Sequence, residues 1–189
     1  MMKRCDWTTS DPLYIAYHDK EWGRPQYDSL KLFEMLCLEG MQAGLSWITI
    51  LKRRENYREA FAGFKPEVIA GYSPEKVDQL LQNKGIIRNR RKIEAIIANA
   101  EAYLSIQETT SFSDYLWTFV GGQPIVHRFA SQNSIPTSDE ISRKMSRDLK
   151  KCGFKFVGET ICYAFMQATG MVNDHLVDCY CYRQIAALD

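Results

Sequence analysis

The feature that most constrains the fold of this chain is a series of apolar segments with helical spacing. In residues 88–104 the apolar side chains of Ile93, Ile96 and Leu104 recur as they do on one face of a helix. Residues 121–136 lack this spacing and predict a loop or a short irregular element, and convincing strand alternation is absent from the sequence. We therefore expect an all-α protein with eight or more helices.

Capping residues predict where several of these helices begin and end. Asp28 or Ser29 is a suitable N-cap for a helix that stops at Gly40. The same signals bound three further expected helices: residues 73–85 with Ser73 as the cap and Gly85 as the stop, residues 137–153 with Thr137 and Glu140 as a capping box, and residues 159–170.

Length and composition indicate one unit formed by residues 1–189, with room for two lobes around a cleft. No apolar run is long enough to span a bilayer and no signal-peptide pattern opens the chain, so we expect a cytoplasmic protein without membrane contacts. The net charge of +1 does not indicate a nucleic-acid binder. Residues 84–92 and 143–156 are locally basic, and they form either one binding footprint or ordinary solvated helix faces.

Glu39 occupies an unusual position on its predicted helix. On a helical wheel it falls within the apolar stripe of Leu32, Met35 and Leu36, whereas Glu34 falls on the opposite face. A buried carboxylate costs several kcal/mol unless it is paired or hydrogen-bonded. Either the last turn frays, or an internal arginine pairs with Glu39, or the carboxylate faces an enclosed site that binds a ligand.

Aromatic residues are concentrated near Glu39 in the sequence. The first 47 residues include Trp7, Tyr14, Tyr17, Trp22 and Trp47. Such clusters are often part of a hydrophobic core. Combined with a carboxylate on an apolar face, this cluster also predicts a pocket for a flat, cationic ligand held by stacking and cation–π attraction.

Two glycines bound a short apolar turn between two predicted helices. Gly153 and Gly158 let backbone N–H groups face outward at the start of the second helix, where phosphate groups bind. Lys155 adds positive charge nearby, and Thr160 offers a hydroxyl. The spacing is typical of a helix-hairpin-helix, which binds the DNA backbone without reading sequence; the alternative is an ordinary turn between helices.

One of three histidines and two of six cysteines lie within residues 173–182. On a helix, His175 and Cys179 would share one face, as a pair of metal ligands does, whereas Cys181 would point elsewhere. The alternative is that these side chains only pack together. The lone His127 predicts a structural or solvated side chain.

The chain also contains four longer motifs: YHDKEWG at 17–23, LEGMQAGLSW at 38–47, GFKFVG at 153–158 and MVNDHL at 171–176. In this order they resemble the 3-methyladenine DNA glycosylase I subfamily of the helix-hairpin-helix DNA glycosylases, and the resemblance covers almost the whole chain. In MVNDHL, Asn173 stands where the wider superfamily has its catalytic Asp. This departure fits the subfamily, because methylation at N3 makes adenine cationic and a good leaving group.

The resemblance implies a monofunctional enzyme that flips 3-methyladenine out of alkylated double-stranded DNA and hydrolyses its N-glycosidic bond. Free 3-methyladenine and an abasic site would be the products. By the same resemblance, Glu39, Tyr17 and Trp47 recognise the base. The remaining aromatic wall would be formed by Trp7, Tyr14 and Trp22.

The resemblance further implies that Gly44 and Leu45 insert a wedge into the DNA, although simple core packing is an alternative for Leu45. The helix-hairpin-helix would hold the DNA backbone without reading sequence. Its contacting residues would be Gly153, Lys155, Gly158 and Thr160.

A zinc ion is also implied, bound by four residues from both ends of the chain. With no open coordination position, this zinc would be structural, and it would join the terminal segments into one lobe beside the central helices and the helices of residues 137–172. Its ligands would be Cys5, His18, His175 and Cys179.

Two other classes of protein remain open, namely a DNA-binding module without activity, suggested by the absent Asp, and a zinc hydrolase. We expect a monomer, the default for a small enzyme that scans DNA.

Overall fold

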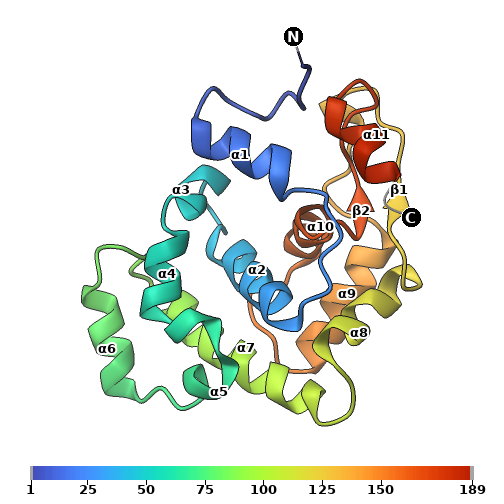
Figure 1. Ribbon diagram of the computed structural model, residues 1–189. Helices are drawn as coiled ribbons and strands as arrows, with labels where there is room; N and C mark the ends of the chain where they lie inside the picture. Colours follow the sequence, from blue (N-terminus) through green and yellow to red (C-terminus); the bar gives the residue numbers. More distant parts are fainter. Residues whose placement is uncertain (1, 188–189) are drawn as a thin grey trace.

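Two helices, α2 (Ser29–Met41) and α10 (Glu159–Ala168), lie in the middle of the molecule, and the other elements surround them (Figure 1). The computed structural model describes residues 2–187. The prediction of a mainly helical protein is confirmed. The remaining helices are α1 (Pro12–Lys20), α3 (Trp47–Leu51), α4 (Arg54–Ala60), α5 (Pro66–Ile69), α6 (Pro74–Gln82), α7 (Arg90–Gln107), α8 (Phe112–Trp117), α9 (Glu140–Lys151) and α11 (Tyr180–Ala186), with 3-10 turns η1 (Ala62–Phe64), η2 (Thr118–Val120) and η3 (Gln132–Ser134).

Helix α2 begins where its capping residue predicts. The Asp28 side chain accepts a hydrogen bond from the backbone N–H of Lys31 at 2.9 Å, which satisfies one of the free donors of the first turn. The helix continues one residue past Gly40 to Met41. From Leu36 onward every residue of α2 is buried, so its second half is a core element rather than an amphipathic surface helix.

The predicted capping box of α9 is wrong in its residues. Asp139, not Thr137, is the N-cap: its Oδ1 accepts from the Ser142 backbone N–H at 2.6 Å, and the Ser142 Oγ accepts from the Asp139 backbone N–H at 2.9 Å. The chain therefore enters the helix two residues later than predicted, and Glu140 is its first residue. Helix α6 similarly stops at Gln82, before the expected Gly85.

One short sheet departs from the all-α expectation. Strand β1 (Ile125–Val126) pairs in parallel with β2 (Val172–Asn173). Two residues are too few to show alternation, and the partner lies about 47 positions away in the sequence, so no local pattern predicts this pairing. The sheet brings the residues that follow each strand, His127 and Asp174, into contact.

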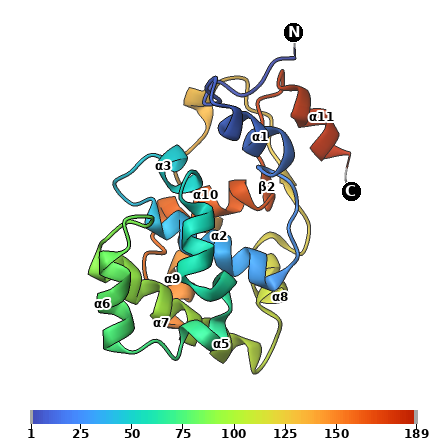
Figure 2. The same cartoon turned by 60° about the vertical axis from the view of Figure 1, so that its left-hand side comes forward.

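The two ends of the described chain lie at the same end of the molecule, close to α11, in both views (Figures 1 and 2). The backbone N–H of Tyr180 donates to the Lys3 carbonyl at 2.9 Å, and the Lys3 side chain forms an ion pair with Asp178. Helices α4 to α7 lie on the side of α2 that faces away from α11 and the two termini (Figure 1). Within residues 2–187, no helix combines the length and the apolar character needed to cross a membrane.

Candidate active site and metal centre

A cavity of about 200 Å³ opens between α1, α2, α3 and α10, and we call it the aromatic pocket. The structure brings six predicted residues, five aromatic rings and one carboxyl, around this single cavity. Polar side chains from Gln42, Gln132 and Gln167 complete the lining with Ala164. The six predicted lining residues are Trp7, Tyr14, Tyr17, Trp22, Glu39 and Trp47.

The rings of the aromatic pocket support one another through tilted and edge contacts. The Trp7 ring lies 5.1 Å from Tyr14 and 5.0 Å from Trp22, and the Tyr17 ring lies 5.6 Å from Trp47, all between centroids. These are favourable aromatic geometries, and all five rings line the cavity. The Trp47 Nε1 donor is buried and finds no hydrogen-bond partner among the described residues, so a ligand acceptor would satisfy it.

Glu39 is 4% exposed and lines the aromatic pocket. Its carboxyl makes no ion pair and no side-chain hydrogen bond with any residue between 2 and 187. Helix α2 stays regular to Met41, so neither the frayed turn nor the internal arginine explains this position. Burial raises the pKa of Glu39 to about 8. A cationic ligand would reverse this effect and favour the carboxylate.

A second hollow of about 190 Å³ adjoins the aromatic pocket and shares Glu39, Gln42 and Ala164 with it. Gly44 and Leu45 line one part of this hollow, and Thr160 of α10 lines another. Leu45 is 39% exposed, so core packing does not account for it. The residues expected to act as a wedge thus lie beside the base-sized aromatic pocket rather than in the core.

The turn between α9 and α10 has the conformation expected of its glycines. Gly153 has φ +102°, which favours glycine, and Gly158 is the N-cap of α10. The turn is fastened to α7, because the Lys155 backbone N–H donates to Asn99 Oδ1 at 2.7 Å and Asn99 Nδ2 donates to the Lys155 carbonyl at 3.3 Å.

The same helix α7 also holds the segment that follows α2. The buried Lys92 ammonium donates to the carbonyl oxygens of Met41 and Ala43, at 2.7 Å each. These are carbonyls at the end of a helix, where a cation is favourable. Lys92 and Asn99 are seven residues apart in α7 and therefore lie on the same side of it.

Four buried side chains form a second cluster, which we call the histidine–cysteine cluster: Cys5, His18, His175 and Cys179. The His175 Nδ1 lies 3.4 Å from the Cys5 Sγ and 3.5 Å from the Cys179 Sγ, and the His18 Nε2 lies 3.5 Å from the Cys179 Sγ. Tetrahedral zinc, with its usual bond lengths, separates a cysteine sulfur from a histidine nitrogen by about 3.6 Å. The donor set and its spacing therefore fit a closed zinc site.

The outer contacts of the cluster also fit a metal site, in which each histidine uses its second nitrogen as a donor. The His18 Nδ1 lies 2.8 Å from Asp19 Oδ1, and the His175 Nε2 lies 3.0 Å from the Trp22 carbonyl. Arg4 holds the pKa of the Asp19 carboxyl well below its usual value, so Asp19 is an ionised acceptor. At Gly23, with φ +77°, a Cβ would lie 2.9 Å from the His175 Nε2, so a side chain there would collide with the cluster.

The helical argument for His175 and Cys179 is wrong, although the two side chains do converge. Both precede α11: His175 lies in a loop after β2, and Cys179 is the N-cap of α11. The prediction that Cys181 points away from these residues is also wrong, because its Sγ lies within 4.8 Å of potential metal-binding atoms of His18 and Asp19. Hydrogen bonds from Cys181 and Cys5 lower the pKa of Cys179, which favours the thiolate at the position expected to bind metal.

Comparison with known proteins agrees with this geometry over almost the whole chain. Residues 7–182 match the model of the methyladenine glycosylase family. This protein belongs to the methyladenine glycosylase family. It is 58% identical over 182 residues to the DNA-3-methyladenine glycosylase 1 of Escherichia coli (strain K12), covering 96% of this chain and 97% of that relative.

Solved structures of methyladenine glycosylases share the fold. A crystal structure of 3-methyladenine DNA glycosylase I superimposes with a TM-score of 0.94 at 60% identity, covering 95% of this chain and all of that one. A structure of the Staphylococcus aureus enzyme, described in terms of 3-methyladenine recognition, superimposes with a TM-score of 0.92 at 43% identity and covers 95% of this chain and 96% of its own.

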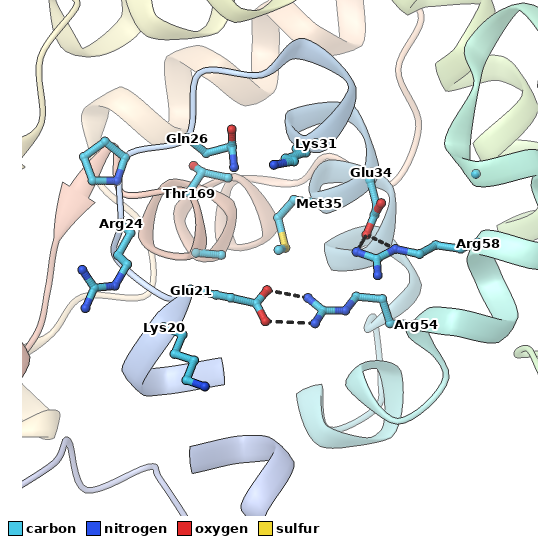
Figure 3. A pocket seen from close by; sticks show the side chains of 13 residues that line it. Lys20, Glu21, Arg24, Gln26, Lys31, Glu34, Met35, Arg54, Arg58 and Thr169 are labelled. Carbon is cyan, nitrogen blue, oxygen red and sulfur yellow. Dashed lines mark hydrogen bonds and ion pairs between the residues drawn. The ribbon is translucent and has the colours of Figure 1, made fainter. Parts of the chain in front are cut away.

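A larger cavity of about 510 Å³ lies elsewhere on this methyladenine glycosylase, and we call it the ion-pair cavity (Figure 3). Its two carboxylates are both engaged: Glu21 with Arg54 and Glu34 with Arg58, each pair at a shortest distance of 2.6 Å. No aromatic ring lines this cavity. Despite its size, it offers neither an aromatic stacking surface nor an unpaired carboxylate for a base.

Sequence reasoning missed four polar residues at the aromatic pocket, namely Gln42, Gln132, Gln167 and Asp174. Gln132 and Gln167 line the aromatic pocket, and the buried Asp174 holds the Gln167 amide at 2.9 Å. Asp174 directly follows Asn173 within the MVNDHL motif, which was its only signal in the sequence. His127, expected to be structural or solvated, lies 2.6 Å from Asp174 through its Nδ1 and is structural.

Proposed function

We propose that this methyladenine glycosylase excises 3-methyladenine from alkylated double-stranded DNA by hydrolysing the N-glycosidic bond. The observation that carries the proposal is the buried Glu39 carboxyl, without any partner among residues 2–187, inside a pocket of five aromatic rings. A neutral pocket would suit any flat base, whereas a buried carboxylate favours one that carries positive charge. Methylation at N3 supplies that charge.

Glu39 would accept a hydrogen bond from the amino edge of the flipped base and stabilise its cationic form. Tyr17 and Trp47 would contact or stack on the base, within the wall that Trp7, Tyr14 and Trp22 complete. When the C1′–N9 bond breaks, its electron pair neutralises the base, while water adds to C1′ and releases a proton to solvent. Asn173 is buried and donates to the Tyr182 carbonyl at 3.2 Å, so it has a structural task and offers no carboxylate.

The turn between α9 and α10 would act as a helix-hairpin-helix on the DNA backbone. Gly153 makes the turn with its positive φ, Gly158 begins α10, Lys155 adds charge, and Thr160 lines the hollow together with Gly44 and Leu45. Phosphate contacts of this kind predict that affinity falls as salt rises. Leu45, exposed beside the aromatic pocket, is suited to fill the gap left by a flipped base.

We also propose that Cys5, His18, His175 and Cys179 hold a structural zinc ion. Four protein ligands leave no position for an activated water, so the ion would contribute stability rather than hydrolysis. His18 follows Tyr17 in α1, and the Trp22 ring contacts His175 edge-on at 4.6 Å between centroids. Metal binding would thereby hold one wall of the aromatic pocket in place.

The test is chromatography of the bases released from methylated DNA by the purified protein. Free 3-methyladenine as the main product is expected, with 7-methylguanine absent. Binding without base release would instead support a DNA-binding module without activity, and 7-methylguanine as the main product would contradict the proposed pocket. Sedimentation of the same preparation tests the expected monomer, and the need to reach chromosomal DNA supports the expected cytoplasmic location.

A further inference from the structure

Asp174 is a completely buried carboxylate that no arginine or lysine side chain contacts among residues 2–187. Three side chains surround it instead. The Tyr163 hydroxyl donates to Oδ2 at 2.7 Å, the Gln167 Nε2 donates to Oδ2 at 2.9 Å, and the His127 Nδ1 lies 2.6 Å from Oδ1. Hydrogen bonds from several donors are what make such a burial tolerable.

This arrangement fixes the orientation of the Gln167 amide. The amide turns its nitrogen towards Asp174, because the Gln167 Nε2 donates to the same oxygen, Oδ2, that accepts from the Tyr163 hydroxyl. Its oxygen, Oε1, is then the free end, and it accepts no hydrogen bond from a protein group in the described part of the chain. Gln167 lines the aromatic pocket together with Glu39, so two acceptor side chains of the pocket are held by different elements, α10 and α2.

The geometry points to Gln167, oriented by Asp174, as a second acceptor that selects 3-methyladenine over 3-methylguanine. The selection follows from the edge that the two bases present, and it rests on the proposed function. Adenine carries at C6 an amino group with two hydrogens, whereas guanine carries an oxygen there, which can only accept. Glu39 takes one amino hydrogen of adenine, and the Gln167 Oε1 takes the other. For guanine, the same two acceptors face a third acceptor.

Asp174 acts here through Gln167 and is a positioning residue. Replacement by Asn would give position 174 both a donor and an acceptor, so the Gln167 amide could turn over and present its NH₂ to the base. Adenine would then lose an acceptor, and guanine would gain a donor. The expected consequence is a change in the choice between the two bases, and not only in overall activity.

The experiment compares release of the two bases from one DNA sample that carries both 3-methyladenine and 3-methylguanine. The measured quantity is the ratio of the two kcat/KM values. Gln167→Met removes the amide at similar volume and should lower the adenine-to-guanine ratio about tenfold. Asp174→Asn should lower it in the same direction. Zinc content and melting temperature are measured in parallel, because Asp174 is adjacent to His175.

Tyr163→Phe is the matched control, since it removes another donor from the same carboxylate without touching Gln167. It should lower stability and leave the ratio within about twofold of the wild type. An unchanged ratio in Gln167→Met, or an equal loss in Tyr163→Phe, would overturn the inference. If Asp174→Asn does not fold, the comparison of Gln167→Met with Tyr163→Phe still decides. A wild type that releases no 3-methyladenine refutes the proposed function, and the selectivity with it.

Discussion

The aromatic pocket and the ion-pair cavity are both lined by α1, α2 and α10, yet they treat charge in opposite ways. In the ion-pair cavity, more than twice as large, each carboxylate is matched by an arginine (Figure 3). In the aromatic pocket, Glu39 has no such partner. The difference teaches that cavity volume is a poor guide to function, whereas a buried carboxylate without a partner identifies where a cation belongs.

The largest expected effect on stability comes from disrupting the histidine–cysteine cluster, which lies behind the aromatic pocket. Cys179→Ser removes one ligand of the histidine–cysteine cluster behind the aromatic pocket, and it should lower the free energy of unfolding by about 4 kcal/mol or more, with loss of bound zinc. Urea unfolding and metal analysis measure both. Cys152→Ser, at an exposed free cysteine, is the control and should change neither. Retained zinc and stability in Cys179→Ser would refute the structural site.

Replacing one carboxyl group in each cavity by a neutral amide compares the two cavities directly. Glu39→Gln should reduce single-turnover release of 3-methyladenine by at least about 100-fold, because the charge that favours a cationic base is lost from a buried site. Glu34→Gln, in the ion-pair cavity, should leave release within about twofold. Equal losses in the two variants would mean that the aromatic pocket has no special role in base recognition.

The unpaired carboxyl should also show itself in the pH dependence of stability. Folded Glu39 keeps its proton up to about pH 8, whereas an unfolded glutamate releases its proton near pH 4.3. Between these values the folded state binds more protons, so raising the pH destabilises it, by at most about 1.4 kcal/mol per pH unit. The free energy of unfolding of the wild type minus that of Glu39→Gln should therefore decline as the pH rises. A difference that is constant between pH 5 and pH 8 would contradict a protonated, buried Glu39.

The smallest effect on stability is expected from breaking one ion pair in the ion-pair cavity. Arg58→Ala breaks the contact with Glu34, which is 14% exposed at its side chain, together with the more exposed contact with Glu55, and should cost about 1 kcal/mol of stability. In a double-mutant cycle with Glu34→Gln, the coupling energy between the two positions should account for most of that loss. Base release should not change, and a large loss of activity in Arg58→Ala would show that the ion-pair cavity takes part in the reaction.

Local signals in the sequence predicted the parts of the fold that depend on neighbouring residues. Asp28 and Ser73 cap the helices they were expected to cap, because a cap is satisfied within one turn. The same reasoning chose Thr137 over Asp139, since both residues offer a suitable oxygen and only the entry of the chain into α9 decides between them.

Contacts between distant segments of the chain were harder to predict from the sequence. The burial of Glu39 could be predicted from helical periodicity alone. The pairing of His127 with Asp174 depends on β1 and β2, whose two-residue pairing leaves no pattern. Cys179 and His175 were paired by a helical argument although they converge through a loop, so a correct grouping followed from an incorrect local structure. The assignment of Cys5 and His18 to the expected metal site came only from the resemblance to a family.

Helix α7 has a thermodynamic consequence for any partner that contacts both the segment after α2 and the turn before α10. Lys92 secures the first and Asn99 the second, from one side of one helix. Their separation of seven residues corresponds to a rise of about 10.5 Å along α7. Because this spacing is established when the chain folds, the loss of loop entropy occurs during folding. A partner that contacts both segments therefore meets two surfaces whose relative positions need no further ordering.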